Sequence, residues 1–177
     1  YGKNRWKSST IISTSIGQGE ILATPIQIAN LAALIANKGY FYTPHIIKSI
    51  EGGEIDSLYR TKHVVNIKEK YFDVVQEGME AVVTKGTARF NGQIDGVTYC
   101  GKTGTAQNPH GEDHSIFMAF APKDKPQIAI AVYVENSGFG ATWAVPIASL
   151  MIEKYLHREI ATKRLHIEKR MMESVIE

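Results

Sequence analysis

The segment Gly101-Lys-Thr-Gly-Thr105 places one cation, two hydroxyls and two glycines within five residues, a set of groups that can bind an anion. With the residues before it, Gly96-Val-Thr-Tyr-Cys-Gly-Lys-Thr103 satisfies the phosphate-loop pattern G-x-x-x-x-G-K-[ST]. A phosphate loop follows a buried strand and leads into a helix. Residues 89–95 do not have the composition of a buried strand, and Gly104-Thr-Ala-Gln-Asn-Pro109 cannot begin a helix. The sequence therefore disfavours nucleotide binding.

The same residues form a consistent site if the segment is an extended strand, which we predict over residues 97–107. A strand at a sheet edge offers unpaired N–H and C=O groups to an extended peptide. Gly104 leaves room for a substrate backbone, while Thr103 and Thr105 share one face and can bind a carboxylate. Lys102 adds positive potential. Strict alternation puts Lys102 on the opposite face, so its long stem must reach around the strand edge.

Composition excludes several broad classes. The 177 residues carry 20 Lys+Arg against 18 Asp+Glu, and a formal net charge of +2 gives no reason to expect nucleic acid. The single cysteine, Cys100, excludes an internal disulfide, and we predict that it is a small buried side chain. No apolar run approaches the roughly 20 residues of a membrane span. The segment His110-Gly-Glu-Asp-His114 is typical of a polar hairpin loop, so we predict no metal site and no cofactor.

The elements that must position this strand follow from periodicity and turn residues. Thr24 and Gln27 form a capping-box pattern at the start of a helix, and Pro122-Lys-Asp-Lys-Pro126 is a turn that should join two strands in an antiparallel hairpin. Residues 40–65 read as a hairpin or loop excursion. The predicted strands are 97–107, 115–121 and 127–135, and the predicted helices are 24–39, 66–85 and 143–157. The fold class is therefore α+β, with three antiparallel strands packed against helices.

The second predicted helix begins at Asn66, with Glu69 as its capping partner, and ends at Lys85-Gly86. Gly78 lies on its apolar stripe, where a missing side chain would permit close packing. The residues of this stripe are Ile67, Tyr71, Val74, Val75, Met79, Val82 and Val83.

Four motifs, in order along the chain, resemble the C-terminal half of class B penicillin-binding protein transpeptidase domains. They are Gly17-Gln-Gly19, Thr24-Pro-Ile-Gln-Ile-Ala29, Lys102-Thr-Gly-Thr-Ala-Gln107 and Ala119-Phe-Ala-Pro122. The combination is most similar to the elongation-type group, penicillin-binding protein 2. The resemblance predicts that residues 1–157 are the C-terminal part of a domain with the penicillin-binding and serine β-lactamase-like fold. Residues 158–177 are then a charged tail, predicted to be helical.

The resemblance implies D,D-transpeptidation of peptidoglycan stem peptides and inhibition by β-lactams. In this family a serine attacks the D-Ala-D-Ala unit, releases the terminal D-Ala and passes the acyl group to an amine. It implies that Lys102 is catalytic and that the backbone N–H of Thr105 is an oxyanion donor. The implied substrate-binding residues are Lys102, Thr103, Gly104, Thr105 and Gln107. It also implies a membrane-embedded glycosyltransferase partner, and a periplasmic location on the bacterial inner membrane through an anchor outside this chain.

The family also needs Ser-x-x-Lys and Ser-x-Asn (or Asp) motifs, and no serine of this chain has Lys three residues later or Asn or Asp two residues later. We therefore expect the nucleophile to precede this segment and the chain to be inactive alone. An exposed strand edge should also let the fragment dimerise. Two alternatives stay open: a serine β-lactamase or D,D-carboxypeptidase relative, and a non-catalytic sensor module that kept the fold.

Overall fold

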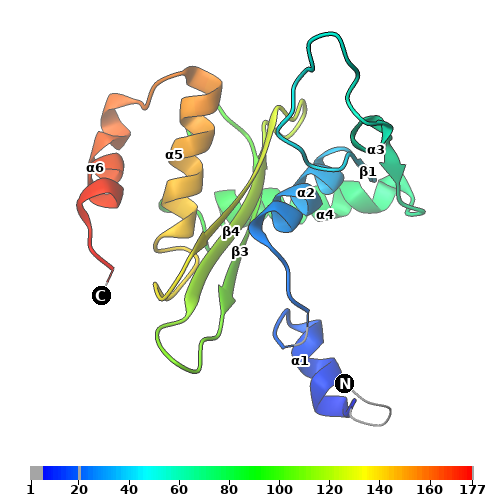
Figure 1. Ribbon diagram of the computed structural model, residues 1–177. Coiled ribbons are helices and arrows are strands. Elements are labelled where there is room, and N and C mark those ends of the chain that lie inside the picture. The colour runs from blue at the N-terminus through cyan, green and yellow to red at the C-terminus, as the bar shows by residue number, and fades with distance from the viewer. Residues whose placement is uncertain (1–5, 20, 177) are drawn as a thin grey trace.

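The computed structural model describes residues 6–19 and 21–176, and its main sheet has three antiparallel strands in the order β3-β4-β5 (Figure 1). These strands are β3 (Cys100–Ala106), β4 (His114–Ala121) and β5 (Ile128–Val134), and a small second sheet pairs β1 (Tyr40–Phe41) with β2 (His63–Val64). The helices are α1 (Ser8–Ser15), α2 (Pro25–Ala36), α3 (Ser57–Arg60), α4 (Glu69–Thr84), α5 (Ala144–His157), η1 (Thr162–Arg164) and α6 (Leu165–Glu173). The predicted α+β class is confirmed.

The three strands of the main sheet lie where turn chemistry and alternation predict them. Ala121 pairs with Ile128 across the proline-bounded turn, which confirms the antiparallel β4–β5 hairpin. Lys102 pairs with Met118, in the middle of β3. Residues 107–113 form a loop that leads to β4 rather than a helix. The phosphate-loop geometry is therefore absent from residues 96–109.

Helices cover both faces of the main sheet (Figure 1). On one face, Phe117 and Ala119 of β4 pack with Ala144, Val145 and Ala148 in the core that contains α5. On the other face, a second cluster joins the sheet to α2 and α4 and contains Ile35, Met79, Cys100 and Phe120. Because β4 contributes to both cores and pairs with β3 along the whole of that strand, the backbone of the candidate site has a rigid support.

The start of α2 is the capping box that the sequence predicts. The Thr24 N–H donates to Gln27 Oε1 at 2.8 Å, and Pro25 occupies the first helical position. The helix ends before Gly39, whose φ of +113° lies in the region that favours glycine.

The second predicted helix needs correction at its start and on its buried face. Helix α4 begins at Glu69 rather than at Asn66, and Lys68 occupies the N-cap position with no side-chain cap. Tyr71 is 54% exposed and Val74 is 66% exposed, and a Cβ on Gly78 would meet no atom within 4 Å. The buried residues are Phe72, Gln76, Met79 and Val83.

The buried face of α4 contains a polar residue, Gln76, and for this reason it does not coincide with the apolar stripe that the sequence predicts. The Gln76 side-chain amide donates to the carbonyl of Ile35 at 2.8 Å and satisfies a carbonyl at the end of α2. A polar side chain can therefore lie in this core at no cost in unpaired groups. A pattern of apolar residues alone does not predict that Gln76 is buried.

The residues after α5 include η1 and α6, and they are anchored to α5 by a buried ion pair. Arg164 is 4% exposed, and its guanidinium lies 3.0 Å from Oε2 of Glu153. It also donates to Oγ of Ser149 at 2.6 Å. The sequence predicts a charged helical tail, and Arg164 is an exception within it because its side chain is buried.

Candidate functional site

The free edge of β3 carries the groups that the sequence singles out. The carbonyl oxygen of Thr105 accepts a hydrogen bond from the Gln18 amide at 2.9 Å, and that of Thr103 accepts one from Nζ of Lys102 at 2.6 Å. Both carbonyls thus point away from β4. In an antiparallel strand the N–H and C=O of one residue point to the same side. The N–H of Thr105 therefore lies on this free edge, where an oxyanion donor would have to be.

Lys102 reaches this edge from the opposite face of the strand. Cys100, two residues earlier and on the same side, packs in the core formed with α2 and α4. Lys102 itself is exposed, and its bond to the carbonyl of Thr103 brings the ammonium over the edge. The aliphatic part of the Lys102 side chain thus bends around the strand edge. The ammonium group and the backbone groups of Thr103 and Thr105 therefore lie on the same edge.

Gln18 is a site residue whose contact with β3 the sequence does not reveal. Its Nε2 donates to the carbonyl of Thr105, and its Oε1 accepts from the N–H of Gln107 at 3.4 Å. One side-chain amide thus makes the two bonds that a neighbouring peptide strand would make. A groove of about 570 Å³ lies here, and its lining includes Gln18, Gln107 and Asp113. The glycines on either side of Gln18 were the available sequence signal.

The loop between β5 and α5 supports β3 from the α5 side. Oγ of Ser115 donates to the carbonyl of Phe139 at 3.0 Å and accepts from the N–H of Ala144 at 3.1 Å. These bonds hold Gly140 so close that a Cβ on it would lie 2.5 Å from the carbonyl oxygen of Gly104. Contact with β3 at this point is therefore backbone against backbone, which only glycine permits.

Cys100 lies beside the candidate site but inside the core. The residue has no exposed surface, and its thiol donates to the carbonyl of Gln76 at 3.3 Å. Burial raises the pKa of the thiol to about 12, which keeps it protonated near neutral pH. The prediction of a small buried side chain is confirmed, and a thiolate nucleophile at this position is excluded.

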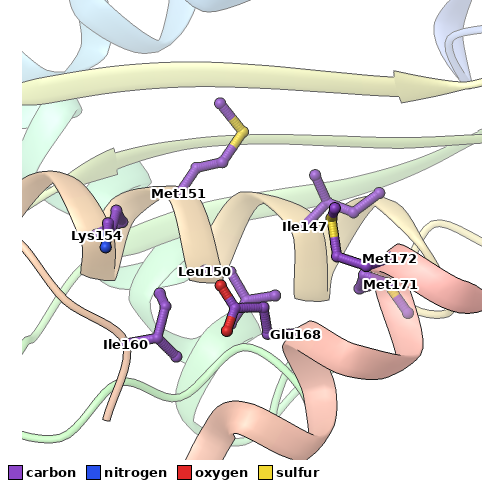
Figure 2. Close-up of a pocket in the computed structure, with 8 residues that line it drawn as sticks. All are labelled: Ile147, Leu150, Met151, Lys154, Ile160, Glu168, Met171 and Met172. Carbon is purple, nitrogen blue, oxygen red and sulfur yellow. The ribbon is translucent and has the colours of Figure 1, made fainter.

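Two further features, the ring of His114 and a hollow between α5 and α6, do not form part of the free edge of β3. Nδ1 of His114 accepts from the N–H of Asn136 at 3.0 Å, so that ring has a structural contact. Residues 6–19 and 21–176 contain no cluster of His, Cys, Asp or Glu side chains that could hold a metal ion. A hollow of about 400 Å³ lies between α5 and α6 (Figure 2), but methionine and aliphatic side chains dominate its lining and no hydroxyl or thiol nucleophile is part of it.

The comparison with known protein families identifies this arrangement. A family model described as the penicillin binding protein transpeptidase domain matches residues 1–153. The chain belongs to this family. Several of its relatives and structural neighbours are of the penicillin-binding protein 2 type, and the fold around β3 is that of penicillin-binding protein transpeptidase domains.

Among the relatives, peptidoglycan D,D-transpeptidase MrdA of Haemophilus influenzae is 32% identical over 178 residues, which is 89% of this chain and 27% of that protein. The crystal structure of Pseudomonas aeruginosa PBP2 in complex with WCK 5153 aligns with a TM-score of 0.77 and 37% identity, covering 89% of this chain and 35% of the other. A chain from a structure on polymerization and crosslinking by a peptidoglycan synthase complex aligns with a TM-score of 0.77 and 32% identity, covering 90% and 28%.

This chain thus spans between about a quarter and a third of the length of these relatives. In the part of it that the structure describes, no helix is both long and apolar enough to cross a membrane.

Proposed function

We propose that this chain supplies the substrate-binding edge of a peptidoglycan D,D-transpeptidase whose nucleophilic serine and its base lie in residues that precede it. The observation that carries the proposal is the pairing of the Gln18 amide with β3, which is the recognition that a peptide bond would receive at the same edge. The missing Ser-x-x-Lys and Ser-x-Asn motifs support the second part. The chain alone would bind but not react.

The edge assigns a role to each of its residues. The N–H of Thr105 would donate to the oxyanion that forms when the serine attacks a D-Ala carbonyl, and one such donor contributes about 3 kcal/mol. Lys102 would stabilise the terminal carboxylate and the charge near the nucleophile. The hydroxyls of Thr103 and Thr105 would bind that carboxylate, while Gly104 and Gln107 would lie along the substrate backbone. β-Lactams would acylate the serine in place of the stem peptide.

Lys102→Ala in the full-length protein should reduce the second-order rate of acylation by a fluorescent penicillin about 100-fold, because an electrostatic group at the reacting centre is removed. Labelling of the protein over time in a denaturing gel measures this rate. Lys125→Ala, at an exposed position in the β4–β5 turn, is the matched control and should keep the wild-type rate. A wild-type rate in Lys102→Ala would contradict the proposed role, and rapid release of hydrolysed penicillin by the wild type would instead favour a β-lactamase.

Location and partners follow from the same proposal. The full-length protein would be anchored in a bacterial inner membrane, with these residues in the periplasm. It would act beside a membrane-embedded glycosyltransferase that makes the strands it cross-links. The structural likeness to a chain of a peptidoglycan synthase complex supports this kind of partner. Co-purification of the full-length protein with a glycosyltransferase from solubilised membranes tests it.

The isolated chain should dimerise through a strand edge. β3 and β5 each pair with one strand in the described sheet, and apolar side chains such as Leu22, in the segment that precedes α2, are exposed. Sedimentation velocity should therefore show a dimer fraction that rises with concentration. A single monomeric species across a hundredfold range of concentration would contradict this expectation.

A further inference from the structure

Thr87 contacts the candidate site from outside the strand that forms it. It lies in the loop between α4 and β3, and its Oγ1 is 2.8 Å from Oγ1 of Thr103. That separation is the usual one for a hydrogen bond between two hydroxyls. Thr103 is one of the residues proposed to bind the substrate carboxylate, so its hydroxyl would interact with both Thr87 and that carboxylate.

Hydrogen bonds of the residues that follow Thr87 hold the loop in place. The N–H of Ala88 donates to the carbonyl of Val82 at 3.0 Å, and Ala88 is buried. Further along, the N–H of Gly92 donates to the carbonyl of Ala88 at 2.8 Å, and the buried hydroxyl of Tyr99 donates to the carbonyl of Gly92 at 2.6 Å. The backbone beside Thr87 is therefore fixed, although its side chain is exposed.

The number of protons at this pair of hydroxyls dictates their roles. A threonine hydroxyl has one proton to donate and two lone pairs that accept. A carboxylate has no proton and only accepts, so Thr103 must give its single proton to the carboxylate in order to bind it. The bond between the two hydroxyls then has to run from Thr87 to Thr103.

We propose that Thr87 is a positioning residue that donates its hydroxyl proton to Thr103 and thereby aims the proton of Thr103 at the ligand carboxylate. This inference rests on the proposed function, because it needs a carboxylate at the edge of β3. Without the Thr87 hydroxyl, Thr103 is free to rotate and to point its proton elsewhere. The loss should therefore affect ligands that have the carboxylate and spare those that lack it.

The test compares a penicillin with its methyl ester as acylating agents of the full-length protein. Thr87→Val keeps the shape of the side chain and removes the hydroxyl, and it should slow acylation by the free acid about tenfold. Acylation by the ester should stay within about twofold of wild type. Thr87→Ser, which keeps the hydroxyl, should restore most of the rate with the acid. Thr84→Val is the matched control, because the Thr84 hydroxyl bonds within α4 to the carbonyl of Glu80.

Equal slowing with acid and ester would overturn the inference, because a merely structural role of Thr87 predicts that result. No slowing with either compound would overturn it as well. If wild-type protein is acylated by neither compound, the proposed function is wrong, and the inference about Thr87 is then wrong as well because it depends on that function. If Thr87→Val does not fold, Thr87→Ala gives the same two rates, and the ratio of acid to ester decides.

Discussion

Arg164→Met is expected to lower the free energy of unfolding of this chain by about 3–5 kcal/mol. The Arg164 side chain is 5% exposed and that of Glu153 is 2% exposed, and their charged atoms lie 3.0 Å apart. Removal of the guanidinium leaves the Glu153 carboxylate buried without its counter-charge. It also removes the bond to Ser149, whose hydroxyl in turn donates to the carbonyl of Asn91. Urea unfolding followed by circular dichroism measures the loss.

Two further variants separate this burial effect from a general effect of charge. Lys163→Met removes an ion pair with Asp95 in which both side chains are exposed, and it should cost less than about 1 kcal/mol. Replacing Glu153 and Arg164 together by Met should recover more than half of the loss, because no buried charge is then left unpaired. A loss below about 1 kcal/mol in the single Arg164 variant would show that the tail is not anchored as described.

Gly140→Ala should cost about 3 kcal/mol of stability and should also slow acylation of the full-length protein by penicillin. The new Cβ would lie 2.5 Å from the carbonyl oxygen of Gly104 and 2.6 Å from that of Ile116. The first oxygen belongs to β3 and the second to β4, and Gly104 and Ile116 are partners in the sheet, so neither oxygen can move without displacing its strand. Because Gly104 adjoins Thr103 and Thr105, that displacement reaches the proposed binding groups.

Gly78→Ala is the matched control for this substitution. It adds the same methyl group in the interior of α4, where no atom lies within 4 Å of the new Cβ. Alanine should therefore stabilise the chain by about 0.5–1 kcal/mol through its higher helix propensity. Thermal unfolding of both variants is the measurement. A Gly140→Ala variant as stable as wild type would mean that the loop between β5 and α5 does not pack in close contact with the backbone of β3.

The strands were predictable because their signals are local. Alternating side chains, the Pro122–Pro126 turn and the Thr24–Gln27 capping box each act within a few residues, and all three occur as expected. The family was predictable from the order of four motifs along the chain, because Lys102-Thr-Gly-Thr-Ala-Gln107 alone is too short to indicate a family. The extended strand predicted over residues 97–107 is present as β3, Cys100–Ala106, despite the phosphate-loop pattern.

The parts that sequence reasoning missed depend on contacts between distant residues. Gln76 and Arg164 are polar and would ordinarily be placed on the surface, but each finds partners from another element in the core. Gln18 and Thr87 are separated from their partners on β3 by 87 and 16 residues, and the glycines beside Gln18 mark a loop without indicating which strand it contacts. Only the packing of the sheet brings these groups together.

The position of the penicillin adduct tests the central claim most directly. Full-length protein is acylated with penicillin, digested and mapped by mass spectrometry, and the isolated 177-residue chain is treated in parallel. The proposed division of the site, with the binding edge on β3 and the nucleophile elsewhere, predicts one adduct on a serine that precedes Tyr1 and no adduct on the isolated chain. A stoichiometric adduct on any residue between 1 and 177 would contradict it.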